Sequence, residues 1–279
     1  MLISLDKTWG LVLGASSGIG RACALAMAEQ GMNVVGVHFD TAAAAESVAE
    51  LTEEITACGV QAHFHNLNAA RKTTRDQLVG TIAELTGGAG LKILLHSLAF
   101  GTLVRYLPEK AGAPMLTQRQ LEMTTDVMAH SLVYWVQDLC AADLLPPGAK
   151  VFAMTSAGAV QHLPSYGAVS AAKVALEAHV RQLACELAPR GVAVNALRAG
   201  VTLTPALRRI PEHREFSRDS ARNNPHHRLT TPQDVAEAMV LLSATSSSWI
   251  TGNTIGVDGG ELLAAGGSWA SQEGIGQDG

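Results

Sequence analysis

The chain has 279 residues, of which 47% are hydrophobic and 16% charged, and its 20 basic and 25 acidic residues give a formal net charge of −5. A chain of this length can bury the core of one α/β domain. The acidic balance leaves no basic field for nucleic acid or an anionic membrane, so neither is expected as a partner.

Short aliphatic runs alternate with longer alanine-rich stretches from one end of the chain to the other. Apolar runs without strict alternation are typical of strands covered on both faces, and seven of them joined by helices predict one doubly wound parallel α/β sheet. No composition break divides the chain, so we expect one domain over residues 1–264 and a flexible tail over 265–279. The predicted strands are 9–15, 33–39, 60–67, 91–99, 150–156, 192–199 and 253–260, and the predicted helices are 19–30, 42–57, 73–86, 118–143, 167–188 and 232–243.

The first predicted strand runs into a glycine-rich turn, GASSGIG, that opens the next helix. Glycine suits this turn because a Cβ would block the close approach of a phosphate or of the helix to the strand. Backbone amides at a helix N-terminus favour an anion, so the turn indicates a dinucleotide pyrophosphate site, with an ordinary tight turn as the alternative. The candidate residues are Gly14, Ser16, Ser17, Gly18, Ile19 and Gly20.

A phenol and an ammonium lie seven residues apart in SYGAVSAAK, at Tyr166 and Lys173. Seven residues are just under two helical turns, so both side chains would leave one helix face. A phenol with a pKa of about 10 is a poor acid–base group at neutral pH unless a nearby cation favours its anion. Each residue could be a plain surface residue, but downstream of the glycine turn the pair predicts a proton donor and the charge that tunes it.

With this glycine spacing and Tyr-x6-Lys pair, the sequence resembles the short-chain dehydrogenase/reductase family over about residues 7–262. The resemblance implies a Rossmann-type domain that binds NAD(H) or NADP(H). It implies that Tyr166 gives or stabilises a proton on the substrate oxygen, while Lys173 holds the nicotinamide ribose and lowers the pKa of the tyrosine. It also implies a homo-oligomer, a dimer or tetramer, formed through the alanine-rich helix 167–188, although alanine is also the best helix former.

The end of the second predicted strand bears on the choice of cofactor. An acidic residue there binds the adenosine ribose of NAD, whereas a basic residue favours the phosphate of NADP. By the resemblance this site falls on His38, and Asp40, two residues on, favours NAD(H) over NADP(H). Arg21 and the pair 71–72 keep NADP(H) open, because they could reach a phosphate. Asn68 matches the adenine-contacting position of the family with an amide in place of the usual acid.

Two segments resemble the enoyl-acyl carrier protein reductases of this family more than its ketoreductases. The HSLAF segment at 96–100 stands where ketoreductases carry NNAG, and RAGVTLT at 198–204 is similar to the SAGPIRT stretch of the enoyl reductases. The usual family asparagine is absent, with Met128 near its expected place. The cofactor contacts that the resemblance implies here are Ser97, Leu98, Ala99, Gly200, Thr202 and Thr204, together with Lys173.

Ser156 departs from both patterns. Enoyl reductases of this type carry a second tyrosine at this position, ten residues before the catalytic one, and the usual ketoreductase serine would fall near Ala153. A hydroxyl can polarise a carbonyl, so Ser156 is the third candidate catalytic residue. The alternative is a hydroxyl that satisfies backbone groups at a strand end.

The expected location is the cytoplasm. The N-terminus lacks the basic and uninterrupted apolar stretches of a secretory signal, and the chain has no run of 18 apolar residues. Four separated cysteines without a CxxC pair are interpreted as small buried residues of helices in a reducing compartment. These cysteines are Cys23, Cys58, Cys140 and Cys185.

The segment 205–228 is expected to form a lid over the substrate. From 208 to 228 it holds six arginines against three acidic residues, which suits an acyl carrier protein or a phosphopantetheine arm, unless it is a solvated helix of mixed charge. His226 and His227 lack further ligands at metal-binding spacing, so no metal is expected.

The predicted function is NAD(P)H-dependent reduction of the C=C bond of an enoyl thioester, in fatty acid or polyketide metabolism. The substrate would be a small molecule or an acyl thioester, free or on a carrier protein. A carbonyl or 3-oxoacyl reductase, or an alcohol dehydrogenase, would use the same site. A non-enzymatic nucleotide-sensing protein is the remaining alternative.

Overall fold

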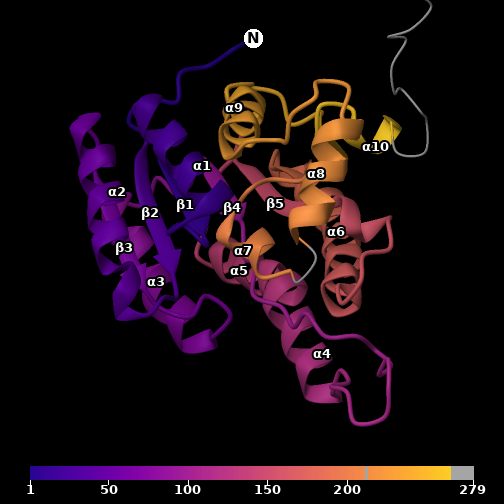
Figure 1. Cartoon of the computed structure of the whole chain (residues 1–279). Coiled ribbons are helices and arrows are strands. Elements are labelled where there is room, and N and C mark those ends of the chain that lie inside the picture. The colour runs from indigo at the N-terminus through magenta and orange to yellow at the C-terminus, as the bar shows by residue number, and fades with distance from the viewer. Residues whose placement is uncertain (211–212, 265–279) are drawn as a thin grey trace, which may run out of the picture.

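Seven parallel strands form one sheet in the order β3-β2-β1-β4-β5-β6-β7, which confirms the predicted doubly wound fold class (Figure 1). The computed structural model describes residues 1–210 and 213–264, and the predicted tail 265–279 lies outside them. The strands are β1 (Trp9–Leu13), β2 (Asn33–His38), β3 (Ala62–Asn66), β4 (Ile93–His96), β5 (Lys150–Ser156), β6 (Ala193–Ala199) and β7 (Thr254–Val257).

Helices cover both faces of the sheet. One core packs against α1 (Gly18–Glu29), α2 (Ala45–Ala57) and α9 (Pro232–Ser243), and the other against α3 (Lys72–Leu85), α5 (Ser131–Ala141) and α6 (Gly167–Leu187). The remaining helical segments are η1 (Ala42–Ala44), α4 (Gln118–Thr125), η2 (Asp126–His130), η3 (Ala157–Ala159), η4 (Ala188–Arg190), α7 (Pro205–Arg208), α8 (His213–Asn223) and α10 (Glu261–Ala264).

The inner strands are buried on both faces, as their apolar runs predict. All five residues of β1 and all four of β4 are buried. The edge strands β3 and β7 are only half-buried, so the expectation of two covered faces is wrong for them. An edge strand has a neighbour on one side alone, and the polar residues of AHFHN in β3 reflect that position.

The chain reverses its strand order at β1, with β2 and β3 on one side and β4 to β7 on the other. In such a sheet the loops after β1 and β4 leave in opposite directions and open a crevice at the carboxyl ends of the strands. The backbone ties these ends together, because Ser97 N donates to Leu13 O (2.8 Å) and Gly14 N donates to Val37 O (2.8 Å). The site is therefore expected at this edge of the sheet.

One predicted helix differs from the structure, and the predicted lid segment is partly helical. The predicted helix 118–143 is interrupted by a π-helical turn, η2, between α4 and α5. The predicted lid 205–228 contains two short helices, α7 and α8, that lie in front of the strands β4 and β5 in Figure 1. Among the helices of residues 1–210 and 213–264, none has both the length and the apolar character that crossing a membrane requires.

The cysteines are not uniformly buried, so the interpretation of all four as core residues is wrong. Cys23 in α1 is buried, and burial raises the pKa of its thiol to about 12. Cys58 follows the end of α2 and is exposed, as is Cys185 on the outer side of α6, while Cys140 is half-buried. Alanine-rich neighbours in the sequence do not reveal which side of a helix faces the sheet.

Candidate active site

The glycine turn after β1 has no room for side chains. Gly14 and Gly18 adopt φ of 92° and 55°, the left-handed region that favours glycine. A Cβ on Gly20 would collide with the Gly14 carbonyl, and one on Gly14 would collide with the Ser97 carbonyl. Ser17 is the N-cap residue of α1, and its side chain makes no capping hydrogen bond with the described residues. A crowded turn beside uncapped helix amides fits the pyrophosphate of a dinucleotide.

Other residues predicted for the cofactor surround this turn. The backbone of Ser97 and Leu98 borders Gly14, and Ala99 follows as an exposed residue. Ser16 is half-buried, and Ile19 packs against the core on the α1 side of the sheet.

The segment predicted to form a lid begins next to the glycine turn. A Cβ on Gly18 would lie 3.1 Å from the Thr204 methyl carbon, and Thr204 Oγ1 accepts a hydrogen bond from Leu207 N (3.2 Å), which caps α7. Thr202 is buried and donates to Gly200 O (2.8 Å). The structure thus brings residues near 200 against residues near 18, as the resemblance implies for one cofactor cleft.

The predicted adenosine positions lie together at the end of β2. His38 Nδ1 and Asp40 Oδ2 are 2.9 Å apart, and Asn66 of β3 exchanges two hydrogen bonds of 3.0 Å with the Asp40 backbone. Asn68 Oδ1 accepts from Ala70 N (3.0 Å) in a local turn. The Asp40 carboxylate therefore faces the His38 ring at a partly exposed edge of the sheet.

Two of the basic residues weighed for a cofactor phosphate are paired with carboxylates. Arg21 Nη2 lies 2.8 and 2.9 Å from the Glu54 carboxylate oxygens, and Lys72 Nζ lies 2.6 Å from Asp76. A phosphate would have to compete with these pairs, so their availability to NADP(H) is reduced.

Two candidate catalytic residues, Ser156 and Tyr166, meet at the end of β5, and the third, Lys173, bonds to the backbone of the same strand. Tyr166 caps the N-terminus of α6, and its hydroxyl lies 3.2 Å from Ser156 Oγ. Gly158 in η3 makes room for the phenol, since a Cβ there would collide with the Tyr166 ring. Lys173 lies seven residues after Tyr166, just under two helical turns. It is 5% exposed and donates to Met154 O (2.6 Å). The hydroxyl of Ser156 is thus directed to Tyr166, and not to the backbone.

Burial dominates the electrostatics of this cluster. It raises the pKa of Tyr166, and the hydrogen bond with Ser156 offsets part of that rise. Burial lowers the pKa of Lys173 to about 8, against the opposing charge of Glu177. Desolvation of the phenol is the larger influence on its pKa in this structure, and the lowering of the Tyr166 pKa by Lys173 stays a prediction.

Three further residues lie near the cluster, and sequence reasoning missed one of them, Tyr106. Met128 is buried and packs with Val169 against Gly101, so an apolar side chain occupies the expected place of the family asparagine. The ring of Tyr106 lies against Gly167 at the start of α6. His96 is wholly buried at the end of β4. The spacing of Tyr106 to Tyr166 carries no sequence signal, because α4, η2, α5 and β5 lie between them in the chain.

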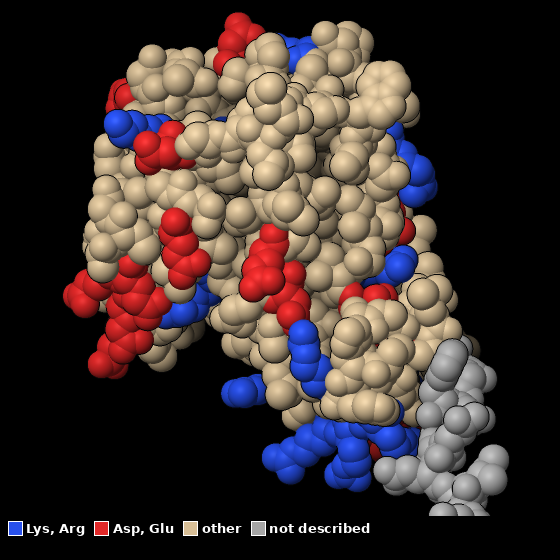
Figure 2. Space-filling view, turned by 90° about the horizontal axis from the view of Figure 1, so that it is seen from above, with Lys and Arg blue, Asp and Glu red and all other residues tan. Residues whose placement is uncertain are grey.

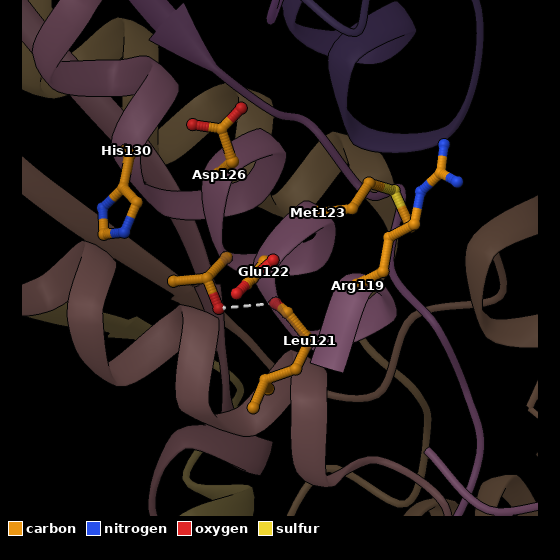
Figure 3. A pocket seen from close by; sticks show the side chains of 7 residues that line it. Arg119, Leu121, Glu122, Met123, Asp126 and His130 are labelled. Atoms are coloured by element: carbon orange, nitrogen blue, oxygen red, sulfur yellow. Dashed lines mark hydrogen bonds between the residues drawn. The ribbon is translucent and has the colours of Figure 1, made fainter. Parts of the chain in front are cut away.

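A separate hollow of about 710 Å³ lies along α4 and η2 (Figure 3). No candidate residue described above is among those that line it. It is lined by Arg119, Leu121, Glu122, Met123, Thr125, Asp126 and His130.

The comparisons with known proteins agree with the fold. A family model described as enoyl-(acyl carrier protein) reductase matches residues 14–261. The chain therefore belongs to the enoyl-acyl carrier protein reductase-like group of the short-chain dehydrogenase/reductase family, and it is an NAD(P)-dependent oxidoreductase.

Three individual relatives show how similar the chain is to known proteins. An oxidoreductase of Mycobacterium tuberculosis is 30% identical over 260 residues, 93% of this chain and 94% of the relative. The NADH-dependent enoyl-acyl carrier protein reductase FabI of Escherichia coli is 31% identical over 150 residues, 54% of this chain and 56% of the relative. A short-chain dehydrogenase structure from Burkholderia cenocepacia in complex with NADP has a TM-score of 0.76 at 25% identity, covering 93% of this chain and 99% of that one. The FabI relative is NADH-dependent and the Burkholderia structure holds NADP, so these two relatives differ in their nicotinamide cofactor.

Proposed function

We propose that the protein reduces the C=C bond of an enoyl thioester, in fatty acid or polyketide metabolism, with Tyr166, Lys173 and Ser156 at the reacting end of the cleft. The hydroxyl pair of Tyr166 and Ser156 supports a reductase site, and the observation that carries the choice of an enoyl thioester is the match of the enoyl-(acyl carrier protein) reductase family model over residues 14–261. The HSLAF segment at the end of β4 favours the enoyl thioester over a ketone.

The cofactor would be held by the glycine turn, the 97–99 segment, Thr202 and Thr204. When bound, a reduced nicotinamide supplies the hydride that adds to the β-carbon of the enoyl thioester. Lys173 would hold the nicotinamide ribose with the N–H groups that Met154 does not use. Its charge also favours negative charge that develops nearby.

Tyr166 would bind the thioester oxygen, where charge collects as an enolate until the α-carbon takes up a proton from solvent and completes the reduction. Its raised pKa keeps the phenol protonated at neutral pH, so it acts as a donor to that oxygen. Ser156, 3.2 Å from the phenol, would align it or donate a second hydrogen bond. Met128 lines the interior with an apolar group and helps to exclude water.

A carbonyl or 3-oxoacyl reductase, or an alcohol dehydrogenase, is the second candidate. The contact between Ser156 and Tyr166 favours it, because two neighbouring hydroxyls can bind one ketone oxygen. Tyr166 would then deliver its proton to the alkoxide. Both functions use the same residues and differ in the bond that is reduced.

We further propose NAD(H) as the preferred cofactor, because the carboxylate of Asp40 at the end of β2 repels a ribose phosphate. The pairing of Arg21 with Glu54 supports the same preference.

The proposed setting is the cytoplasm, with an acyl thioester on coenzyme A or an acyl carrier protein as substrate. Figure 2 shows basic side chains gathered along the lower edge of the face seen from above, with acidic ones to the left and at the centre. An acidic carrier would favour such a basic edge. A homodimer or homotetramer through α6 and the α4–α5 helix is proposed, and the hollow along α4 and η2 would lie at that contact.

The test is to follow the absorbance of NADH and NADPH with crotonyl and acetoacetyl thioesters offered in parallel, each on coenzyme A and on a carrier protein. We expect turnover of the crotonyl thioester with NADH. Turnover of the acetoacetyl thioester alone would replace the first function by the second. Turnover of neither, with cofactor binding intact, would contradict both thioester functions.

A further inference from the structure

His96 is a buried imidazole that the proposed reaction does not use. It ends β4 and is 0% exposed. In the sheet it lies between Leu13 of β1 and Ala153 of β5, at the middle of the crevice. Its Nε2 contacts Ser131 Oγ of α5 at 2.8 Å, so the ring points to the face of the sheet that α5 and α6 cover.

The partners of Ser131 define the tautomer of His96. Ser131 Oγ donates its single hydrogen to Val127 O at 2.7 Å, inside the π-helical turn. It can therefore only accept from His96, whose Nε2 must carry the hydrogen. Burial, together with the charge of Lys173, lowers the pKa of His96 to about 3, so the ring stays neutral. Nδ1 is left as a bare acceptor, and within residues 1–210 and 213–264 it has no hydrogen-bond partner.

Lys173 brings unused donors to the same place. Its Nζ bonds to the carbonyl of Met154, and Met154 follows Ala153, the register partner of His96. The ammonium and the imidazole thus reach the same face of neighbouring strands, one residue apart in register. The ammonium has three N–H donors and Met154 takes one, whereas His96 Nδ1 is an acceptor without a donor.

We propose that one buried water molecule bridges Nδ1 of His96 and Nζ of Lys173, which makes His96 a positioning residue for Lys173. A buried polar atom without a partner is costly, and a water between two polar groups that do not touch satisfies both. The inference deepens the proposed function, because it rests on Lys173 holding the cofactor as an ammonium. Ser131 sets the tautomer that makes Nδ1 the acceptor.

The bridge stabilises the charged form of Lys173. The titratable groups that face this ammonium are Glu177 on α6, which raises its pKa, Tyr166 at the start of α6, and His96 on β4. Glu177 is itself held by Thr155 Oγ1 (2.7 Å). Removal of the acceptor leaves the ammonium less solvated, so the pKa of Lys173 falls further and the ammonium is lost at lower pH.

The test compares three variants. His96→Leu removes the acceptor at similar volume, and we expect the alkaline loss of NADH affinity to move down by about one pH unit, the size of one hydrogen bond to a charged group. His96→Asn places an amide oxygen where Nδ1 stood, and we expect it to restore most of the profile. His63→Leu makes the same exchange on β3, three strands away, and should leave the profile in place.

The first readout is NADH binding by fluorescence from mildly acidic to alkaline pH, with kcat over the same range. An unshifted profile in His96→Leu would overturn the proposal. The second readout is ¹⁵N-histidine NMR of the full chain without cofactor. We expect the Nδ1 resonance of His96 to have the position of a hydrogen-bonded acceptor and to move toward that of a free acceptor in Lys173→Met.

The NMR readout keeps the proposal testable if His96→Leu fails to fold. An Nδ1 signal that Lys173→Met leaves unchanged would overturn it. Neither binding nor NMR needs a substrate, so a wild-type protein that turns over no thioester refutes the proposed function and leaves the test of His96 decisive.

Discussion

The two ends of the candidate cleft are built differently. At the catalytic end, Lys173 is 5% exposed and His96 is wholly buried, so each polar atom there has very few partners. At the adenosine end, the side chain of Asp40 is 33% exposed and that of Arg21 is 30% exposed, and both are paired at the surface. Burial sets protonation at the first end, whereas solvent screens the charges at the second. Substitutions should therefore have large effects on chemistry at one end and modest effects on preference at the other.

The largest effect is expected for Tyr166→Phe. Loss of the hydroxyl that binds the substrate oxygen should lower kcat by about a hundredfold or more, the usual size of a general acid contribution. NADH binding, measured by fluorescence, should be unchanged because the ring is retained. A kcat close to that of the wild type would remove Tyr166 from the proposed mechanism.

Gly20→Ala should act on the cofactor. Its Cβ would meet the Gly14 carbonyl and push the turn away from α1, and such overpacking costs about 1–3 kcal/mol. We expect NADH affinity to fall roughly ten- to a hundredfold in a fluorescence titration. Gly59→Ala is the control, because nothing lies within 4 Å of a Cβ there although its φ of 82° is also positive. Equal NADH affinities for Gly20→Ala and Gly59→Ala would contradict a role of the glycine turn in binding the cofactor.

The pH dependence of turnover should reveal Lys173. Its pKa of about 8 lies below the ordinary value, so the ammonium is present below that pH and is lost as pH rises through it. We expect kcat/KM to fall by up to about tenfold per pH unit above this point. For Lys173→Met we expect a lower kcat/KM that does not fall further as the pH rises through this range. A wild-type profile that stays flat through this range would argue against the ammonium as the active form.

The smallest effect is expected at the adenosine end. Asp40→Asn removes a carboxylate that would repel the phosphate of NADPH, an interaction of about 1 kcal/mol near a solvated surface. The ratio of kcat/KM for NADPH over NADH should rise about fivefold. Asp143→Asn, whose side chain is 89% exposed and pairs with Arg190, should leave the ratio unchanged. A ratio that does not move in Asp40→Asn would contradict the basis for preferring NAD(H).

Local features of the chain could be predicted from the sequence, whereas contacts between distant elements could not. The apolar runs, the GASSGIG turn and the Tyr-x6-Lys pair each lie within one local stretch, so the parallel sheet and the main candidate residues follow from the sequence by short-range rules. The π-helical turn was not predicted, because 118–143 reads as one helix. At the end of this turn Ser131 bonds to Val127 and contacts His96 of β4, a residue 35 positions away in the chain.

The sequence by itself therefore determined the class of fold, the turn for the cofactor and the tyrosine–lysine pair. Only the tertiary structure decided that Ser156 meets Tyr166 and that Nδ1 of His96 is buried without a hydrogen-bond partner among the described residues. The physical reason is that these contacts join separate elements, β4, β5 and α6, whose approach depends on packing. Packing also decides burial, and burial raised the pKa of Tyr166 where the local charge pattern indicated a decrease.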